Sequence, residues 1–599
     1  MIFKVIYDSQ NKDYKKPFGA VRQKEKIQFN VKANKICDVK LITKSIFGFQ
    51  TFDLNYVCKE KNYHKYHIEF NTSKYLGPIY YYFKLNYNGK TYYYTNNEDT
   101  TGGIGKLDHV KPDFYNNIGK TIDNKPELFY QVYIYDIKNK VPEWFKTGLI
   151  YHIFVDRFNN EDSTLEYFDK DLVEVYGGNL KGIINKLDYL DDLGADIIYL
   201  SPIFEAKGHH KYNVGDYEKI ASDFGDIDIF KQLIYEVKKR DMHLILDGVF
   251  NHSGSDSKYF NKYGNYDSLG AYQSTDSKYY SWYKFIDYPD KYECWDNIDT
   301  LPEYNQENQK LQDYFLNNEN SIVKKWLNFG IDGWRLDAAD LLKDEYLTKI
   351  YKTVKEINPN SIIIGELWND ASTFVSKEEK KIRTYMCGNE IESVTDYPFH
   401  GLIINYSNGE FTPQTFRKKI YSLIENFPIE YYYTLSNFTS THDIPRILSI
   451  LNDDINALKM FVVLLMTLPG VPMIYYGDEV GLKGGGDPDN RRPFPWNNMN
   501  TDIYNHFKEM ISIRKKFDAF KQGSIHFIED NDFLIYERKY EDESIYTVLN
   551  NRDNKVFNIN LILDNIKLKD IQTDEIYDTS NTEFQLKKFS YKILKKEKC

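Results

Sequence analysis

Cysteine is scarce in this sequence, and the few cysteines that occur follow no metal-ligand or disulfide pattern. They are Cys37, Cys58, Cys294, Cys387 and Cys599, an odd number without a Cys-x-x-Cys pair. Such scattered thiols favour a reducing compartment over a framework of disulfides. The chain therefore does not belong to the small disulfide-stapled class of secreted domains.

Long apolar runs and an excess of basic charge are also missing. No stretch of about 18 apolar residues occurs, and the start of the chain lacks the basic segment and apolar core of an export signal. Unless a leader has been removed, these absences predict a soluble, cytoplasmic protein. Lys and Arg total 77 against 88 Asp and Glu, a net charge of -11. This balance argues against nucleic acid or an anionic membrane as partner and favours a neutral one.

What the chain has in abundance is length and aromatic side chains. With 599 residues, 42% hydrophobic and 16% aromatic, it can bury large cores, and its length predicts about three or four domains. Aromatic faces suit the apolar faces of sugars, although a biased composition would also give the 53 tyrosines.

The two ends of the chain share one pattern. Residues 1–125 show short alternating apolar runs separated by turn signals such as Asn88-Gly89, which is typical of an antiparallel β-sandwich. Carbohydrate binding, dimer contact and simple packing all remain open as its role. Residues 520–599 return to short alternating runs and predict a C-terminal β-sandwich.

Strands alternate with helices in residues 126–519, which predicts a parallel sheet covered by helices. The eight expected strands lie at 148–155, 196–202, 243–247, 331–337, 361–366, 382–386, 435–443 and 471–476. Eight such units favour a closed (β/α)8 barrel with its chemistry at the carboxyl ends of the strands. The connection at about 251–308 is too long for a bare loop and predicts an inserted subdomain.

Two charged residues end the fourth expected strand, which reads Gly-Trp-Arg-Leu-Asp at 333–337. Alternation puts Arg335 and Asp337 on one face, and a structural salt bridge would explain them alone. The next strand, however, ends in Glu366. Acidic residues at the ends of successive parallel strands lie close together, and two facing carboxyls are what glycosidic bond cleavage requires.

Four segments at strand ends then match one family in order. They read Asp-Gly-Val-Phe-Asn-His at 247–252, Gly-Trp-Arg-Leu-Asp at 333–337, Gly-Glu-Leu-Trp at 365–368 and Phe-Thr-Ser-Thr-His-Asp at 438–443. These segments resemble the signature regions of the α-amylase superfamily of retaining glycoside hydrolases. With the leading β-domain and Leu-Pro-Glu-Tyr-Asn at 301–305, the chain looks most like the neopullulanase, cyclomaltodextrinase and maltogenic amylase branch.

The resemblance implies three catalytic carboxyls. Asp337 would be the nucleophile that forms a covalent glycosyl intermediate, Glu366 the general acid and then base, and Asp443 the third carboxylate that holds sugar hydroxyls. The chemistry needs an ionised Asp337 and a protonated Glu366, ~5–5.5 Å apart. We expect Arg335 to favour the charged form of Asp337.

The same resemblance implies a substrate-binding set that includes Asp247 and Arg335. His252 and His442 resemble the histidines that bind hydroxyls of the sugar at the cleavage point, and Tyr212 resembles the aromatic ring that stacks on it. A histidine taken alone would more often be a hydrogen-bonding core residue, but the surrounding motifs reverse that expectation.

Three positions depart from the family pattern. Asn213 stands where relatives usually have Asp, His152 replaces a common Gln, and Leu341 replaces a polar or charged residue near the leaving-group side of the cleft. The last change leaves acceptor specificity open. None of the three touches the catalytic carboxyls.

A structural calcium ion is a further expectation. Asn160, Asp162, Gly177 and Asn179 resemble the calcium loop of some family members, and calcium prefers such oxygen ligands. An Asn- and Asp-rich turn would explain the pattern equally well. Asn179 stands where the pattern has Asp, which lowers the charge of the ligands. Catalysis itself should need no cofactor.

The implied function is hydrolysis of α-1,4 glucosidic bonds, with α-1,6 bonds left open, in maltooligosaccharides, cyclodextrins, pullulan or starch. A transglycosylase on the same glucans stays open, because a sugar hydroxyl can capture the same intermediate. A non-catalytic glucan-binding protein is disfavoured because all three carboxyls are present. By resemblance, residues 1–125 would also form a homodimer, with activity on small substrates exceeding activity on starch.

Overall fold

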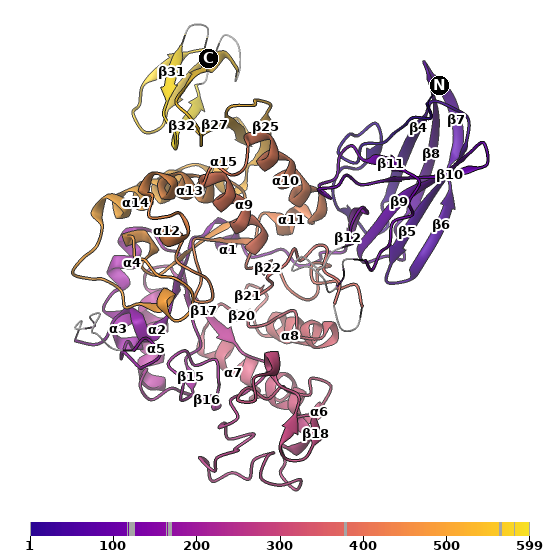
Figure 1. The fold of residues 1–599 in the computed structure, drawn as a ribbon. Coiled ribbons are helices and arrows are strands. Elements are labelled where there is room, and N and C mark those ends of the chain that lie inside the picture. Colours follow the sequence, from indigo (N-terminus) through magenta and orange to yellow (C-terminus); the bar gives the residue numbers. More distant parts are fainter. Residues whose placement is uncertain are drawn as a thin grey trace. The chain divides into compact units, whose positions relative to one another are not determined.

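A computed structural model describes residues 2–116, 118, 126–162, 165, 171–376, 380–561, 566–579 and 582–597. The chain folds into two compact units, whose elements are labelled in Figure 1. The first unit comprises Met1–Lys140, Trp368–Glu392 and Thr415–Tyr432. The second comprises Val141–Leu367, Ser393–Gln414 and Tyr433–Cys599.

Two sheets form the β-sandwich of the first unit. One has the order β1 (Val5–Ile6), β4 (Lys26–Ala33), β8 (Tyr63–Asn71) and β7 (Asn55–Glu60), with β2 (Lys15–Lys16) on β4. The other has the order β11 (Lys106–Asp108), β10 (Lys90–Thr95), β9 (Gly77–Tyr87), β12 (Tyr130–Tyr135) and β3 (Val21–Arg22), with β5 (Asp38–Ser45) on β9 and β6 (Gly48–Asp53) on β5. Most of α10 (Pro413–Asn426) and all of α11 (Ile429–Tyr432) belong to this unit.

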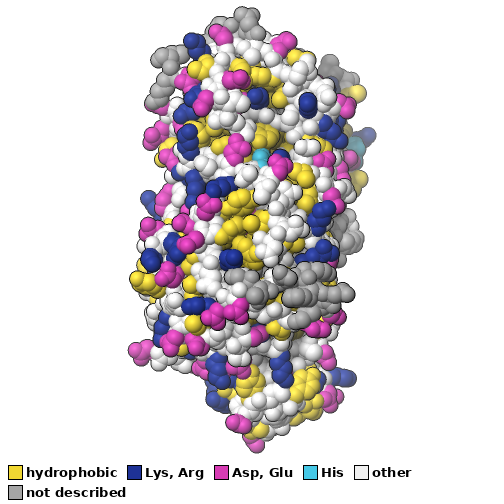
Figure 2. Space-filling model, turned by 90° about the vertical axis from the view of Figure 1, so that its left-hand side faces the viewer, with side chains coloured by type: hydrophobic (Ala, Val, Ile, Leu, Met, Phe, Trp, Pro, Cys, Tyr) yellow, Lys and Arg dark blue, Asp and Glu magenta, His cyan; other side chains and the backbone are white. Residues whose placement is uncertain are grey.

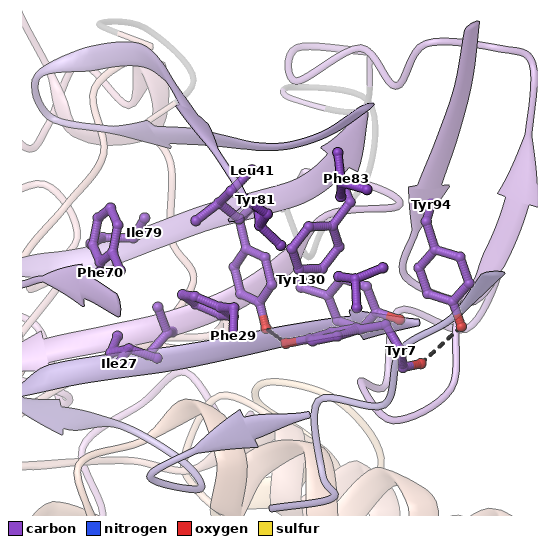
Figure 3. Packing of buried hydrophobic residues seen from close by; sticks show 14 of the residues in the cluster. Tyr7, Ile27, Phe29, Leu41, Phe70, Ile79, Tyr81, Phe83, Tyr94 and Tyr130 are labelled. Atoms are coloured by element: carbon purple, nitrogen blue, oxygen red, sulfur yellow. Dashed lines mark hydrogen bonds between the residues drawn. The ribbon is translucent and has the colours of Figure 1, made fainter. Parts of the chain in front are cut away.

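Tyrosines fill much of the sandwich core and bond to one another (Figure 3). The hydroxyls of Tyr7 and Tyr81 lie 2.7 Å apart, and Tyr94 donates its hydroxyl to the carbonyl of Tyr7 at 2.8 Å. A buried hydroxyl left unpaired would cost about 1–3 kcal/mol. Part of the tyrosine abundance therefore serves packing.

The sandwich extends beyond the boundary expected after residue 125. Strand β12 pairs antiparallel with β9 and parallel with β3, and all six of its residues are buried. Its apolar run completes this sheet, although the sequence interpretation assigned it to the barrel domain.

Eight parallel strands form the barrel of the second unit. They are β13 (Ile150–Ile153), β14 (Ile197–Leu200), β17 (His243–Gly248), β20 (Gly333–Leu336), β21 (Ile362–Gly365), β22 (Ser393–Val394), β23 (Ser436–Phe438) and β24 (Val471–Tyr475). Each pairs with the next in the order β22-β21-β20-β17-β14-β13-β24-β23. A parallel bridge between Thr395 and Ser436 joins the two ends. The predicted (β/α)8 barrel is confirmed.

One predicted strand is wrong. The run 382–386 forms no barrel strand, and β22 takes the sixth place. The apolar side chains of the run serve the first unit instead: Ile382 joins a buried cluster with Tyr80, and the backbone N–H of Met386 donates to the hydroxyl of Tyr133 at 3.1 Å. Hydrophobicity alone did not reveal which core would bury it.

Helices follow the strands as alternation predicted. Those of the second unit include α3 (Leu180–Ile184), α4 (Leu187–Leu193), α5 (Ile227–Lys238), α7 (Ile322–Phe329), α8 (Asp344–Ile357), α9 (Tyr397–Ser407), α13 (Ile455–Thr467) and α14 (Thr501–Lys516). In α5, Asp226 caps the first turn by accepting two backbone N–H groups, and Phe230, Leu233 and Val237 bury one face. Between α3 and α4 the helical structure is interrupted at residues 185–186.

The expected insertion lies between β17 and α7. It contains little regular structure: η1 (Tyr280–Trp282), β18 (Phe285–Asp287), β19 (Lys291–Tyr292) and η2 (Trp295–Asn297). Aromatic packing supplies its core, as where Trp282 stacks on Tyr259 with ring centroids 5.5 Å apart.

The C-terminal region forms two further sheets. One has the order β25 (Ser524–Ile528), β26 (Leu534–Tyr540), β27 (Glu543–Asn550), β32 (Ser590–Lys596), β29 (Lys567–Asp570) and β30 (Ile576–Asp578). The other pairs β28 (Lys555–Asn558) with β31 (Glu583–Leu586). A buried apolar cluster lies within these sheets.

In the part of the chain that the structure describes, no helix is long and apolar enough to cross a membrane. Figure 2 shows acidic and basic side chains interspersed over the face that it displays.

Candidate active site

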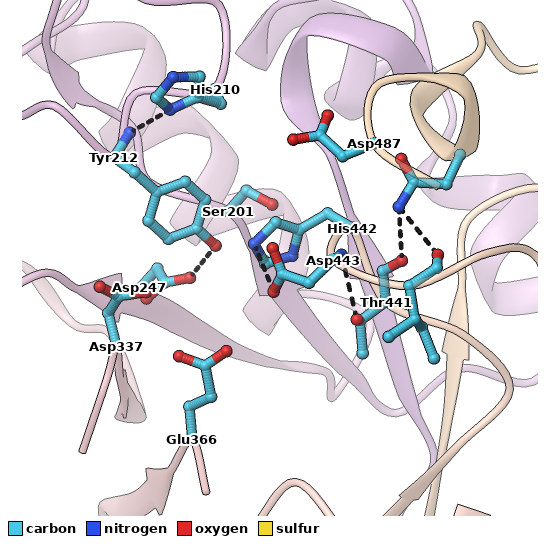
Figure 4. A network of polar contacts seen from close by, with 12 residues as sticks. Ser201, His210, Tyr212, Asp247, Asp337, Glu366, Thr441, His442, Asp443 and Asp487 are labelled. Carbon is cyan, nitrogen blue, oxygen red and sulfur yellow. Dashed lines mark hydrogen bonds and ion pairs between the residues drawn. The ribbon is translucent and has the colours of Figure 1, made fainter. Parts of the chain in front are cut away.

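The expected site residues meet at the carboxyl ends of neighbouring barrel strands (Figure 4). Asp247 lies in β17 and pairs in register with Arg335 of β20. Asp337 follows β20 directly, and Glu366 follows β21. All four side chains are buried. The alternation that placed Arg335 and Asp337 on one face is confirmed.

Arg335 lies at the centre of the site, where its guanidinium contacts three carboxylates. Its Nη1 donates to Asp247 Oδ1 at 2.9 Å and to Asp337 Oδ1 at 3.0 Å. Its Nη2 lies 2.9 Å from Glu366 Oε1. Burial alone would lower the pKa of Arg335, but the negative charges of Asp247 and Glu366 raise it well above its ordinary value. The arginine stays charged.

The backbone after the fourth strand is bent toward Glu366. Ala338 has a φ of 45°, in the left-handed region that costs a non-glycine residue about 1 kcal/mol or more. In this conformation the N–H of Ala338 donates to Glu366 Oε2 at 2.8 Å. Glu366 is therefore held by a backbone donor on one oxygen and by Arg335 on the other.

The carboxyls of the site outnumber the cations and hold protons tightly. Burial raises the pKa of Asp337 well above its ordinary value, and the carboxylate of Glu366 adds to this while Arg335 opposes it. Burial, and then Glu366, raises the pKa of Asp443 to about 7. Arg335 favours the charged form of Asp337, as the sequence interpretation expected, but burial and the charge of Glu366 outweigh it. The cluster as a whole therefore binds a proton near neutral pH.

Asp443 lies after β23 beside a histidine and a second arginine. His442 Nε2 is 3.2 Å from Asp443 Oδ2, and Arg491 Nη2 is 3.6 Å from Asp443 Oδ1. Arg491 also donates its Nε–H to the carbonyl of His442 at 2.9 Å. Burial, followed by the charge of Arg491, lowers the pKa of His442 well below its ordinary value. A neutral His442 can donate to and accept from sugar hydroxyls.

Tyr212 and His252 complete the expected binding set. Tyr212 donates its hydroxyl to Asp247 Oδ2 at 2.7 Å, and its ring stacks on His442 with centroids 4.8 Å apart. His252 is buried, and neither ring nitrogen has a hydrogen-bond partner of normal geometry among the described residues. Burial lowers its pKa to about 4, so it too is neutral. Buried polar atoms of this kind point to a polar ligand.

Two contributors were not assigned a role from the sequence. Tyr199 of β14 donates its hydroxyl to Asp247 Oδ2 at 2.5 Å, the same oxygen that Tyr212 uses. Arg491 opens the Arg-Arg-Pro-Phe-Pro-Trp segment at 491–496. Strand alternation could have placed Tyr199 inside the barrel, but the partner of Arg491 depends on loop geometry.

The residues expected to bind calcium carry little charge. Asn179 already caps α3 with its side-chain oxygen, and the N–H of Gly177 donates to Asp156 at 2.9 Å. Asn160 is half-buried and Asp162, which supplies the single carboxylate of the set, is exposed. Among the described residues there is no group of three or more His, Cys, Asp or Glu suited to a metal ion. This donor set fits calcium poorly, and the site stays a prediction.

The three departures from the family pattern have different environments. His152 is buried inside the barrel and Asn213 has a buried side-chain oxygen, whereas Leu341 is 41% exposed.

Comparison with known proteins shows the class to which this fold and site belong. The family model described as "Alpha amylase, catalytic domain" matches residues 152–523. The chain therefore belongs to the alpha-amylase family. The resemblance inferred from the strand-end motifs is confirmed.

Its relatives carry several names. The chain is 32% identical to an amylopullulanase from Thermoanaerobacter thermohydrosulfuricus over 83% of this chain and 38% of that protein. It is 32% identical to neopullulanase 2 from Thermoactinomyces vulgaris over 72% of this chain and 74% of that protein. A solved cyclomaltodextrinase structure matches 99% of both chains with a TM-score of 0.70 and 21% identity, which supports the fold alone. The chain spans 31–39% of the length of three curated amylopullulanases that it matches.

Proposed function

We propose that this chain is a retaining glycoside hydrolase that cleaves glucosidic bonds in α-glucans. The observation that carries the proposal is the placement of Asp337 and Glu366 on adjacent nitrogens of one buried guanidinium, that of Arg335, with Asp443 nearby. This arrangement supplies a nucleophile, a proton donor and a fixed positive charge between them. Membership in the alpha-amylase family supports the same chemistry.

The reaction follows from these positions in two steps. In the first, Asp337 attacks the anomeric carbon and forms a glycosyl ester, while Glu366 gives its proton to the departing glycosidic oxygen. Asp337 loses its negative charge as the ester forms, and Glu366 gains one as it gives up its proton, so the total charge of the two carboxyls bound to Arg335 is unchanged. In the second, Glu366 takes a proton from water, and the resulting hydroxide equivalent displaces Asp337. Two inversions leave the anomeric configuration unchanged.

Asp443 and the neutral histidines would bind the sugar at the cleavage point. Because the pKa of Asp443 is raised to about 7, its carboxyl can be a donor or an acceptor toward sugar hydroxyls near neutral pH. His252 has unsatisfied ring nitrogens, and His442 lies against Asp443. Bonds of this kind that strengthen as the ring distorts lower the barrier.

The substrates we propose are maltooligosaccharides, cyclodextrins, pullulan and starch, with α-1,4 bonds as the main target. The names of the relatives, which include amylopullulanase and neopullulanase 2, support pullulan and starch as candidate substrates. Two measurements test the proposal: chromatography of the products from these four substrates, and NMR of the anomer that forms first. Retained α-anomers and shorter glucans are expected, whereas inverted products or no cleavage would reject it. Products longer than maltotriose at high maltotriose concentration would instead identify a transglycosylase.

We also propose that the protein works in the cytoplasm as a homodimer formed through its N-terminal sandwich. The absence of any disulfide in the described part of the chain supports a reducing compartment. Exposed apolar side chains on β6, β7 and the turn before β6 support a contact surface: Ile46, Phe47, Phe49, Tyr56 and Val57. Light scattering of the wild type and of a Phe47→Asp, Phe49→Asp variant tests the dimer, since a monomeric wild type would reject it.

A structural calcium ion at Asn160, Asp162, Gly177 and Asn179 is a further proposal. If the ion binds there, removing it with a chelator lowers the melting temperature, because a ligand of the native state stabilises that state. Identical melting curves with chelator and with added calcium would eliminate the site.

A further inference from the structure

His152 lies inside the barrel and joins three neighbouring strands. It is in register with Tyr199 of β14 and with Tyr475 of β24. Its ring stacks on that of Tyr199, with centroids 4.2 Å apart and planes at 21°, and lies 5.0 Å from the ring of Tyr475. The preceding residue, Tyr151, donates its hydroxyl to Glu479 at 2.6 Å. Alternation along β13 thus turns His152 to the opposite, interior side.

His152 closes a circuit of side-chain contacts, which we call the contact ring: His152, Tyr199, Asp247, Tyr212 and His442. His152 stacks on Tyr199, and Tyr199 donates to Asp247 Oδ2 at 2.5 Å. Tyr212 donates to the same oxygen at 2.7 Å, and its ring lies parallel to that of His442 within 11°. His442 completes the circuit, since its ring centroid lies 5.5 Å from that of His152 with the planes at 81°.

The contact ring reaches the reacting groups at two points. Asp247 accepts from Arg335, the guanidinium that also contacts Asp337. His442 lies 3.2 Å from Asp443. A displacement of one member can therefore be passed to both the nucleophile and the third carboxylate.

The rings of Tyr199, Tyr475 and His442 pack against His152, which is 1% exposed, so it lies behind them and does not face a substrate itself. Its Nε2 lies 3.1 Å from the hydroxyl of Ser201, and no partner is found for its Nδ1 in the described part of the chain. Burial lowers its pKa well below the ordinary value, and the charges of Arg335 and Arg446 lower it further. The ring is neutral and acts by packing, not by charge.

We propose that His152 is a positioning residue, which holds Tyr199 and His442 in the orientations that the reaction needs. The inference rests on the proposed function, because it concerns the rate of that reaction. Removing the imidazole would leave a cavity between the two rings, and misplacement of reacting groups by about 1 Å can cost about 10²-fold in rate. Because His152 touches no substrate, the loss falls on kcat and not on KM.

The test compares three substitutions with a matched control, using an α-glucan that the wild type cleaves. His152→Ala should lower kcat about 10- to 100-fold with KM within about threefold of wild type. His152→Phe keeps a ring on Tyr199 and should recover most of kcat, whereas His152→Gln keeps a polar contact to Ser201 but loses the stack and should resemble alanine. His506→Ala removes a buried imidazole of α14 that bonds the carbonyl of Lys459 at 3.0 Å.

The control separates positioning from stability. His506→Ala should lower the melting temperature by an amount similar to His152→Ala while leaving kcat unchanged. Near-wild-type kcat in folded His152→Ala would overturn the inference, as would a rise in KM alone or a better rate for Gln than for Phe. Should the alanine variant fail to fold, the order of Phe and Gln still decides.

A crystal structure of His152→Phe and His152→Gln gives a readout without activity. The inference expects the rings of Tyr199 and His442 to keep their positions with Phe and to shift with Gln, and unmoved rings in both would overturn it. The proposed function fails separately, through a wild type that cleaves no α-glucan.

Discussion

Two buried arginines of the same barrel differ in the number of carboxylates that they contact. Arg335 contacts the three carboxylates of Asp247, Asp337 and Glu366. Arg446 pairs with one carboxylate, that of Asp478, at 2.9 Å. It also donates to backbone carbonyls, including that of Asn490 at 2.9 Å, and its guanidinium lies over the rings of Tyr475 and Tyr476. Both guanidinium groups are almost fully buried, so burial does not distinguish them.

From this difference we propose that Arg446 serves the structure and Arg335 the reaction. The pair of Arg446 and Asp478 is balanced in charge, and Thr439 donates a further bond to Asp478 at 2.6 Å. The cluster around Arg335 has negative charge in excess, which is unfavourable in a buried site unless a function requires it. The same excess retains the proton that glycosidic cleavage needs.

The largest effect is expected for a substitution of a carboxylate that contacts Arg335. Asp337→Asn removes the nucleophile and should lower kcat by about 10⁴-fold or more. It also removes one negative charge from the cluster, so the melting temperature should stay equal or rise. Steady-state kinetics and a melting curve check both. Activity above a tenth of wild type would contradict the assignment.

Glu366→Gln should produce a smaller loss that depends on the substrate. A maltooligosaccharide needs its leaving group protonated and should react about 10²- to 10³-fold more slowly, whereas an activated aryl glycoside should form the glycosyl enzyme at a far less reduced rate. Burst kinetics with both substrates measure the ratio. Equal losses on the two would argue against Glu366 as the acid.

Asp478→Asn removes the carboxylate that pairs with Arg446. It should lower the stability of the fold and leave the chemical step nearly unchanged. An uncompensated Arg446 in a buried site is expected to cost about 3–5 kcal/mol. The urea midpoint should fall, while kcat per folded molecule stays within about fivefold of wild type. If unfolding is unchanged, the structural role is refuted.

The smallest effect is a pH-dependent shift of stability at Asp443. Its pKa is about 7 in the folded protein, above the ordinary value of 3.8. The folded state therefore binds the proton more tightly, so this group stabilises the fold below pH 4 and loses that contribution as the pH rises through 7. Asp443→Asn removes the titration, and its melting temperature relative to wild type should be higher by roughly 2–5 °C at pH 8 than at pH 4. A difference that is independent of pH would contradict the raised pKa.

Much of the active site could be predicted from the sequence, because its residues lie on one strand or on strands that follow each other in the chain. Arg335 and Asp337 share a strand, and Glu366 ends the next one, so alternation and strand order placed them together. The contact ring was not accessible, since the meeting of His152 with Tyr199 and His442 depends on register across strands distant in sequence.

The errors have the same origin. The run 382–386 is apolar enough for a barrel strand, but the N-terminal unit buries it. Strand β12 looked like the start of the barrel domain and instead pairs with β9. An apolar pattern shows that a segment is buried but not which core or sheet it joins.

The most direct test of the account is to trap the glycosyl enzyme. Glu366→Gln enzyme, treated with an activated α-glucosyl or α-maltosyl donor, should form its ester quickly and hydrolyse it slowly, because the base of the second step is missing. Peptide mapping by mass spectrometry should then locate one glycosyl group on Asp337. A glycosyl group on another residue, or turnover of the donor to an inverted product without any adduct, would contradict the account.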